Sequence, residues 1–369
     1  MKPNILFINS ITIYGGGEVW MLTVMKELVA RGYNVTLICK PEAEIIQYID
    51  NTSIDVLKIR IAGDFDPLTI SRLINIYRKR KIDIVVANVG KDIRLAGMAA
   101  KFVSHVSVIA LHQVDREIKN NLRYRFTYNS LADIIVVNSL ATKKTLLKSA
   151  SWLINEKINV VHHGIDYEKY SAANTKDIRT EFGLSPQDLI IGFVGRLGVQ
   201  KGVKYMLEGF RSIAEKFGNL HLIIVGTGEQ ESLIKEFAEK FNLENKIHLL
   251  GFRKDIPDVM RTFSIFLLPS LWEGFGIVLI EAMAAGKPIV ATNTSSIPEI
   301  VEDGRNGILV QPENAEAISV ALEKLISDPE LRIKFGKEGE KVVRENFTTE
   351  RMINDYEKIF YELKKENDI

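Results

Sequence analysis

The sequence has 369 residues, 46% of them hydrophobic and 26% charged, and this ordinary composition excludes collagen-like and strongly disordered chains. At ~100 to 200 residues per domain, such a length predicts two or three domains. The net charge of +1 conceals an asymmetry, because residues 1–168 carry 22 basic and 16 acidic side chains whereas residues 169–369 carry 26 and 31. We expect the basic half to face a phosphorylated molecule or an anionic membrane, and not nucleic acid.

The chain begins with a short apolar run at residues 5–8, which is too short for a signal-peptide core and is typical of a first β-strand. No segment offers the ~18 uninterrupted apolar residues that a membrane span needs. The single cysteine, Cys39, excludes an intrachain disulfide and a cysteine-based zinc cage. These features predict a reduced, cytoplasmic protein.

Short β-branched runs alternate with turns and helical-period segments along the first half, which indicates βα units around a buried parallel sheet. The apolar runs stop between residues 163 and 186, where residues 171–175 have the composition of a surface connection. The strands expected before this point are 4–9, 33–39, 54–59, 82–87, 106–111, 134–138 and 158–162.

The alternation then restarts and ends in charged helical sequence, with helices expected at 314–326, 329–345 and 349–366. The fold class is therefore α/β, with two Rossmann-like domains, 1–168 and 169–348, facing a central cleft. The last helix, about 349–369, could return to the first domain. The strands expected in the second domain are 189–194, 220–225, 247–250, 265–268, 288–291 and 308–310.

The stretch 269–288 carries the clearest chemical signal, because it runs from a strand through a glycine turn into a helix. Unpaired N–H groups of Gly276, Ile277 and Val278 at the start of that helix would bind phosphate together with the helix dipole. Glu273 precedes the turn and Glu281 lies within the helix, so the two carboxylates can hold different parts of one ligand.

Two further segments supply groups that suit a pyrophosphate. Arg196 and Lys201 follow a strand at its carboxyl end, where open α/β sheets bind ligands. Near the start of the chain, Gly16 and Gly17 belong to a three-glycine turn that lets the backbone approach a ligand closely.

In this order the motifs resemble the retaining GT-B glycosyltransferases of family 4. His163 stands where that family usually has asparagine, which puts a fine donor contact from this position in doubt. The matching elements are Gly16-Gly17-Glu18, His112, Asn138-Ser139, His163-Gly164-Ile165-Asp166, Gly195-Arg196-Leu197 with Lys201-Gly202, Val225-Gly226-Thr227-Gly228, and the pair Glu273 and Glu281.

The resemblance implies a role for each candidate residue. The catalytic set would be His112, facing the reacting sugar, Glu273, contacting it, and Arg196 with Lys201, neutralising the diphosphate. Further donor contacts would come from Glu281 to the ribose, from Arg253 near the nucleobase, and from the backbone of Gly16, Gly17, Gly274, Phe275, Gly276, Ile277 and Val278.

The implied activity is a retaining transfer of a sugar from a nucleotide-diphosphate sugar, with UDP favoured, to an acceptor hydroxyl in glycan, polysaccharide or glycolipid biosynthesis. No cofactor and no metal would be needed. Two alternatives remain open: a GT-B nucleotide-sugar epimerase, which would act on donor alone, and a non-catalytic protein that binds sugar nucleotides.

Two charged segments receive simpler interpretations. Asp64-Phe65-Asp66 matches the metal-binding Asp-x-Asp of another transferase class, but Asp66-Pro67 is also typical of a helix N-cap, which we favour. The basic residues Arg116, Lys119, Arg123 and Arg125 follow His112. They are expected to border the acceptor and to meet an anionic membrane or a lipid phosphate, with peripheral association at the inner face of the membrane.

Overall fold

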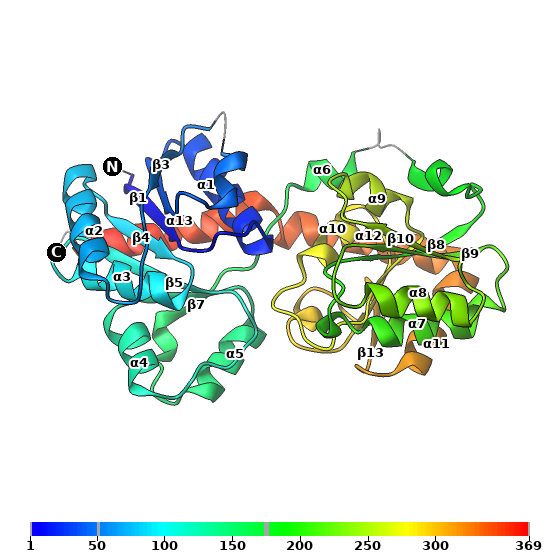
Figure 1. The fold of residues 1–369 in the computed structure, drawn as a ribbon. Helices are drawn as coiled ribbons and strands as arrows, with labels where there is room; N and C mark the ends of the chain where they lie inside the picture. Colours follow the sequence, from blue (N-terminus) through cyan, green and yellow to red (C-terminus); the bar gives the residue numbers. More distant parts are fainter. Residues whose placement is uncertain (1, 50–51, 173–176, 368–369) are drawn as a thin grey trace. The chain divides into compact units, whose positions relative to one another are not determined.

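A computed structural model describes residues 2–49, 52–172 and 177–367. The chain divides into two compact units, the first formed by residues 1–163 and 349–369 and the second by residues 164–348 (Figure 1). The first unit thus ends a few residues before the boundary expected after residue 168. The expected connection at 171–175 lies partly outside the described residues.

The first unit contains a parallel sheet with strand order β3-β2-β1-β4-β5-β6-β7. Each run that the sequence predicted as a strand overlaps one, because most of these strands are covered on both faces and are read as continuous β-branched sequence. The strands are β1 (Ile5–Asn9), β2 (Val35–Cys39), β3 (Asp55–Lys58), β4 (Ile84–Ala87), β5 (Ser107–His112), β6 (Ile134–Val137) and β7 (Ile158–Val160).

Helices cover both faces of this sheet and enclose two apolar cores. One core joins the sheet to α1 and α13, and the other joins it to α2, α3 and α5. The α-helices of this unit are α1 (Gly16–Ala30), α2 (Pro67–Arg80), α3 (Gly90–Ala100), α4 (Leu122–Arg125), α5 (Leu140–Ser149) and α13 (Thr349–Asn367).

The second unit contains a parallel sheet with strand order β10-β9-β8-β11-β12-β13. Its strands also overlap the predicted runs, although β10 and β12 end one residue later and β13 begins one residue earlier than expected. They are β8 (Leu189–Val194), β9 (Leu220–Val225), β10 (Ile247–Gly251), β11 (Ile265–Leu268), β12 (Ile289–Thr292) and β13 (Gly307–Val310). Its α-helices are α6 (Tyr167–Ser171), α7 (Val203–Ala214), α8 (Glu231–Lys240), α9 (Ile256–Thr262), α10 (Ile277–Ala284), α11 (Ala315–Ser327) and α12 (Pro329–Asn346).

The strand order of the second sheet creates a switch point beside β8. The chain passes from β8 to β9 and β10 on one side, and then returns to place β11 on the other side of β8. Loops that leave neighbouring strands at such a point diverge and leave space for a ligand at the carboxyl edge of the sheet. The loops after β8 and β11 carry most of the predicted site.

Helix α13 packs against α1 and against β4 and β5 of the first unit (Figure 1). The Trp20 indole on α1 donates to Met352 Sδ at 3.2 Å, and Arg31 Nη1 pairs with Glu357 Oε2 at 2.7 Å. Phe360 is fully buried in the same core. None of the described helices combines the length and the apolar character that crossing a bilayer requires.

Candidate functional site

The loops after β8 and β11 are joined by main-chain contacts at the carboxyl edge of the second sheet. Leu271 N donates to Gln200 O at 2.8 Å, and Gln200 Nε2 donates to Trp272 O at 2.9 Å. Gly202 has φ +64°, and a Cβ there would lie 2.0 Å from Pro269 O. Only glycine permits this approach, so the sequence at 202 fixes how closely the two loops pack.

Lys201 and Glu273 form an ion pair across these loops. The Lys201 side chain is 14% exposed and that of Glu273 11%. Ser270 Oγ donates to Glu273 Oε2 at 3.3 Å, which adds a hydrogen bond to the same carboxylate oxygen. The structure thus brings together a cation and a carboxylate that the sequence analysis assigned to separate parts of a ligand.

Helix α10 begins directly after this pair. Gly276 is its N-cap at φ +90°, a left-handed conformation that favours glycine. Within the described part of the chain, the N–H groups of Gly276, Ile277 and Val278 donate to no protein acceptor. Three free donors and the positive end of the helix dipole therefore meet at one point, which suits a phosphate.

One face of α10 stays open while the rest is buried. Ile277, Val278 and Glu281 are half-buried, whereas Leu279 and Ile280 are fully buried. Glu281 lies one helical turn, about 6 Å, along the axis from the free N–H of Ile277. The open face therefore offers an anion site and, beyond it, a carboxylate.

Glu281 accepts a hydrogen bond from the Tyr170 hydroxyl on α6, with 2.5 Å between Tyr170 Oη and Glu281 Oε1. Burial raises the pKa of Glu281 to about 7, although the Tyr170 hydrogen bond and the Lys169 ammonium act in the opposite direction. Burial and the nearby carboxylate raise the pKa of Tyr170, so its hydroxyl remains a donor. Sequence reasoning missed Tyr170, since no local pattern links it to a helix 111 residues later.

The two arginines assigned to the donor differ in their surroundings. Arg196 is exposed, and no carboxylate pairs with its guanidinium within residues 2–49, 52–172 and 177–367. Arg253 pairs with Glu181 Oε2 at 2.8 Å and with Asp255 Oδ2 at 2.5 Å, and its pKa is raised by those hydrogen bonds. Arg253 is therefore already neutralised, whereas Arg196 is available to an anion.

The turn residues before α10 contribute main chain and not side chains. Phe275 is 3% exposed, and its ring packs against Phe347 at a centroid distance of 5.9 Å. Ser296 Oγ donates to the carbonyls of Phe275 at 3.0 Å and Glu273 at 3.4 Å, which holds the turn. Gly274 is half-buried between them. A ligand can thus meet only the backbone at Phe275.

In the first unit, Gly16 and Gly17 form the exposed first residues of α1. Neither has a positive φ, and a Cβ at either would contact nothing within 4 Å. Glu18 is buried and accepts from Gly15 N at 3.1 Å and from Asn9 Nδ2 at 3.1 Å. Glu18 therefore fixes the helix start, and the glycines leave a bare helix N-terminus.

His112 is the last residue of β5, at the carboxyl edge of the first sheet. Its Nε2 lies 3.2 Å from Arg116 O, and its Nδ1 lies 3.4 Å from the Tyr128 hydroxyl. Burial lowers its pKa from the usual 6.5, so the ring is neutral at pH 7. A neutral imidazole held in one orientation can accept or donate a hydrogen bond but carries no charge.

The Asp-x-Asp segment is a helix start, as the sequence analysis preferred. Asp66 is the N-cap of α2 and accepts from Thr69 N at 2.9 Å. Asp64 pairs with Arg94 at 2.8 Å and with Arg123. Among the residues that the structure describes, no group of three or more His, Cys, Asp or Glu side chains could hold a metal ion.

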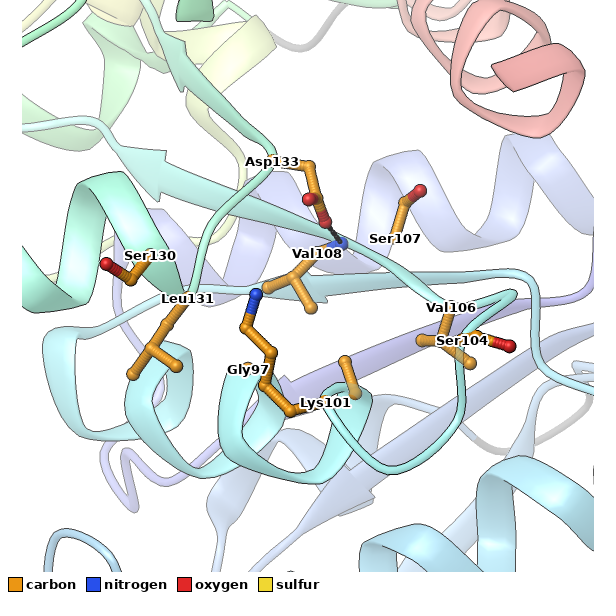
Figure 2. Close-up of a pocket in the computed structure, with 10 residues that line it drawn as sticks. Gly97, Lys101, Ser104, Val106, Ser107, Val108, Ser130, Leu131 and Asp133 are labelled. Atoms are coloured by element: carbon orange, nitrogen blue, oxygen red, sulfur yellow. Dashed lines mark hydrogen bonds between the residues drawn. The ribbon is translucent and has the colours of Figure 1, made fainter. Parts of the chain in front are cut away.

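A pocket of about 250 Å³ lies in the first unit, away from the predicted residues (Figure 2). Gly97 and Lys101 border it at the end of α3, and Ser107 and Val108 border it at the amino end of β5. Asp133 Oδ2 accepts from Val108 N at 2.7 Å beside it. This pocket is at the amino edge of the sheet and contains none of the candidate residues.

Comparison with known proteins places the chain in a family. The family model for "Glycosyltransferase Family 4" matches residues 14–169, and that for "Glycosyl transferases group 1" matches residues 174–342. The capsular polysaccharide biosynthesis glycosyltransferase CapM of Staphylococcus aureus is 26% identical over 352 residues, which are 92% of each chain.

A second relative and a solved structure agree with this family assignment. The UDP-Gal:alpha-D-GlcNAc-diphosphoundecaprenol alpha-1,3-galactosyltransferase of Escherichia coli is 26% identical over 350 residues, 90% of each chain. The crystal structure of Anabaena HepE in complex with UDP has the same fold, with a TM-score of 0.85 and 20% identity over 97% of this chain and 100% of that one. The chain therefore belongs to the GT-B glycosyltransferases of family 4, the glycosyl transferases group 1.

Proposed function

We propose that this glycosyltransferase transfers a sugar from a UDP-sugar to an acceptor hydroxyl, with retention of configuration and without a metal ion. The observation that carries the proposal is the combination of Lys201, Arg196 and the free N-terminus of α10 at one switch point. Two cations and three N–H donors suit a diphosphate, which has two negative charges and several acceptor oxygens.

The parts of the donor can be assigned to positions along the open face of α10. A diphosphate at the N–H groups of Gly276, Ile277 and Val278 would place the ribose about one turn along, beside Glu281. Uracil as the base is supported by the names of the Escherichia coli relative and of the HepE complex, which both contain UDP. The same relative and CapM support a polysaccharide or glycolipid acceptor.

Charge stabilisation accounts for the reaction. The bond between the sugar C1 and the diphosphate oxygen breaks, and a bond forms from the acceptor oxygen to the same face of C1. The acceptor proton passes to an oxygen of the departing diphosphate. Lys201, Arg196 and the helix N-terminus would stabilise the negative charge that develops on this leaving group. Glu273 would orient the sugar by accepting from its hydroxyls.

Metal independence is proposed because positive groups of the protein take the place that a divalent cation has in other transferases. The Arg196 guanidinium, the Lys201 ammonium, which is shared with Glu273, and the positive end of the α10 dipole would together face the two negative charges of the diphosphate. Turnover should therefore persist after exhaustive treatment with EDTA. A loss of activity that Mg²⁺ or Mn²⁺ restores would contradict this part of the proposal.

The experiment is a UDP-release assay with a panel of UDP-sugars, followed by proton NMR of the product formed on the best acceptor. Retention predicts that the product has the α configuration of the donor. Arg196→Ala should lower kcat/KM by about 10²-fold, the scale for one charge-stabilising group. Binding of GDP or ADP in preference to UDP, or a β-linked product, would contradict the assignment.

Peripheral membrane association is a further part of the proposal. Leu122 is 83% and Phe126 43% exposed, and both lie beside the basic residues Arg123 and Arg125. Exposed apolar side chains flanked by cations suit an anionic lipid surface. Co-sedimentation with phosphatidylglycerol vesicles at low salt, lost in Leu122→Glu, is the expected result; no sedimentation of the unaltered protein would contradict it.

A further inference from the structure

Helix α6 holds Tyr170 in a fixed position against α10. Asp166 caps the helix by accepting from Lys169 N at 3.4 Å. At the other end, Arg261 Nη1 donates to the carbonyls of Tyr170 at 3.3 Å and Ser171 at 3.0 Å. Tyr170 itself is 6% exposed. A helix of only five residues is thus held at both ends, and its one buried aromatic ring points to Glu281.

The Tyr170 hydroxyl engages only one oxygen of the Glu281 carboxylate. Tyr170 Oη donates to Oε1 at 2.5 Å. Oε2 has no hydrogen-bond partner among the described residues, and Glu281 is half-buried, as are Ile277 and Val278. The carboxylate is therefore fixed through one oxygen, while the other remains for a ligand.

The hydrogen bond from Tyr170 offsets part of the free energy that is needed to bury the Glu281 carboxylate in its charged form. A carboxylate in an apolar helix tends to bind a proton, and a protonated carboxyl has lost much of its ability to accept hydrogen bonds. A hydrogen bond from a neutral hydroxyl favours the ionised form and limits the rotation of the side chain. Both effects prepare Glu281 to accept from a vicinal diol.

We propose that Tyr170 is a positioning residue for donor binding, and that its hydroxyl orients Glu281 so that the second carboxylate oxygen receives the ribose hydroxyls. The inference rests on the proposed function of Glu281. Tyr170 does not contact the ribose in this proposal, since its hydroxyl is occupied by Oε1. Its contribution should appear in donor affinity and not in the chemical step.

Other charged groups lie near the pair and affect its titration. Lys169 on α6 lowers the pKa of Glu281, and Asp166, the N-cap of that helix, raises the pKa of Tyr170. From α9, Arg261 contacts the Tyr170 carbonyl. On α12, Glu340 approaches Gly286 beyond the far end of α10. Replacing the tyrosine removes a group that lowers the pKa of Glu281, so this pKa should rise.

The test compares Tyr170→Phe with Tyr167→Phe. Both substitutions remove one hydroxyl from the same helix, but the Tyr167 hydroxyl accepts from Arg344 Nη2 at 2.7 Å and does not touch Glu281. Tyr170→Phe should raise KM for the UDP-sugar about tenfold, the scale of a hydrogen bond to a charged group, with kcat within about twofold. The acidic limb of kcat/KM should move to higher pH. Tyr167→Phe should alter neither.

A nucleotide without ribose hydroxyls shows whether Tyr170 acts by positioning Glu281 or only by packing against the helices around it. Calorimetry with UDP and with 2′,3′-dideoxy-UDP measures how strongly each variant recognises the ribose hydroxyls. The unaltered protein should prefer UDP, Glu281→Ala should lose that preference, and Tyr170→Phe should retain only part of it. A full preference in Tyr170→Phe would overturn the inference while leaving the donor site intact.

The same experiment also tests the proposed function, through the Glu281→Ala variant. If Glu281→Ala binds UDP and dideoxy-UDP as the unaltered protein does, Glu281 does not hold the ribose, and the donor assignment on which the inference rests fails first. If Glu281→Ala loses the preference for UDP but Tyr170→Phe keeps it in full, the donor assignment stands and only the positioning role of Tyr170 fails. Thermal unfolding of each variant, expected within a few degrees of the unaltered protein, shows that the fold is retained.

Discussion

Lys201 and Glu273, which are 72 residues apart in the chain, pair with each other at the carboxyl edge of the second sheet. Each has little exposure, and Ser270 hydrogen-bonds to the same carboxylate. A largely buried ion pair is tolerated when both charges are compensated, and removing one partner leaves the other unpaired. The pair therefore holds both side chains in place before a donor binds.

Lys201→Ala should lower kcat by at least about 10²-fold, because one preorganised positive group is removed from the leaving diphosphate. Lys204→Ala is the matched control, since Lys204 is an exposed lysine on the adjoining helix α7. UDP release under saturating donor measures the effect. Near-normal turnover in Lys201→Ala, or an equal loss in Lys204→Ala, would refute the role assigned to Lys201.

Gly202→Ala should destabilise the second unit by at least about 1–3 kcal/mol, the scale for strained backbone. The added Cβ would lie 2.0 Å from Pro269 O at a φ of +64°. Gly218→Ala is the control, because a Cβ there meets nothing within 4 Å. Urea unfolding should show the lower midpoint only in Gly202→Ala, and equal midpoints would argue against the close approach of the two loops.

His163→Asn should reduce the loss of folding stability that occurs as the pH falls below about 6.5. Burial lowers the pKa of His163 to about 3, whereas an unfolded histidine titrates near 6.5. Between these values the unfolded chain binds one more proton, so stability is complete above about pH 6.5 and falls as the pH drops towards 3. The loss from this group alone reaches about 2 kcal/mol at pH 5.

Urea unfolding between pH 4.5 and 7.5, followed by tryptophan fluorescence, tests this, because Trp20 lies 5.5 Å from His163 between ring centroids. The control His105→Asn replaces an exposed histidine of the same unit. If His163→Asn loses stability with acid as steeply as the unaltered protein, another group must cause the loss.

Phe360→Ala should destabilise the first unit by about 3–5 kcal/mol, the usual cost of truncating a buried phenylalanine. Phe360 on α13 is fully buried beside Tyr356, with their ring centroids 5.9 Å apart. The control Lys358→Ala removes a side chain that is 71% exposed. A urea-unfolding transition, followed by tryptophan fluorescence, that is unchanged in Phe360→Ala would show that α13 does not stabilise this core.

Much of the fold could be predicted because its determinants are local. Strands buried on both faces read as unbroken β-branched runs, and helices such as α12 start at an Asp-Pro pair, here Asp328 and Pro329. The glycine turn before an apolar run likewise predicted the start of α10, where the structure places Gly276 as the N-cap. Each of these signals lies within a few residues of the feature that it specifies.

The site could be predicted only in part, because its pairings join distant segments. The sequence identified Lys201, Glu273 and Glu281 but not that the first two would pair, or that Tyr170 would bind the third. It assigned Phe275 a backbone contact with the donor but gave no sign that its ring would pack against Phe347. Whether a side chain points to a ligand or a core depends on tertiary packing, which residue type and spacing do not encode.

The return of α13 to the first unit has a consequence for synthesis on the ribosome. Residues 164–348 are contiguous and can complete their fold as soon as they have emerged, whereas the first unit, although translated earlier, waits for residues 349–367 to cover the apolar surface around Trp20. Domains usually fold in order of translation. In this chain the later unit is the first whose residues are all available, and the core of the earlier unit stays incomplete until the last helix has been made.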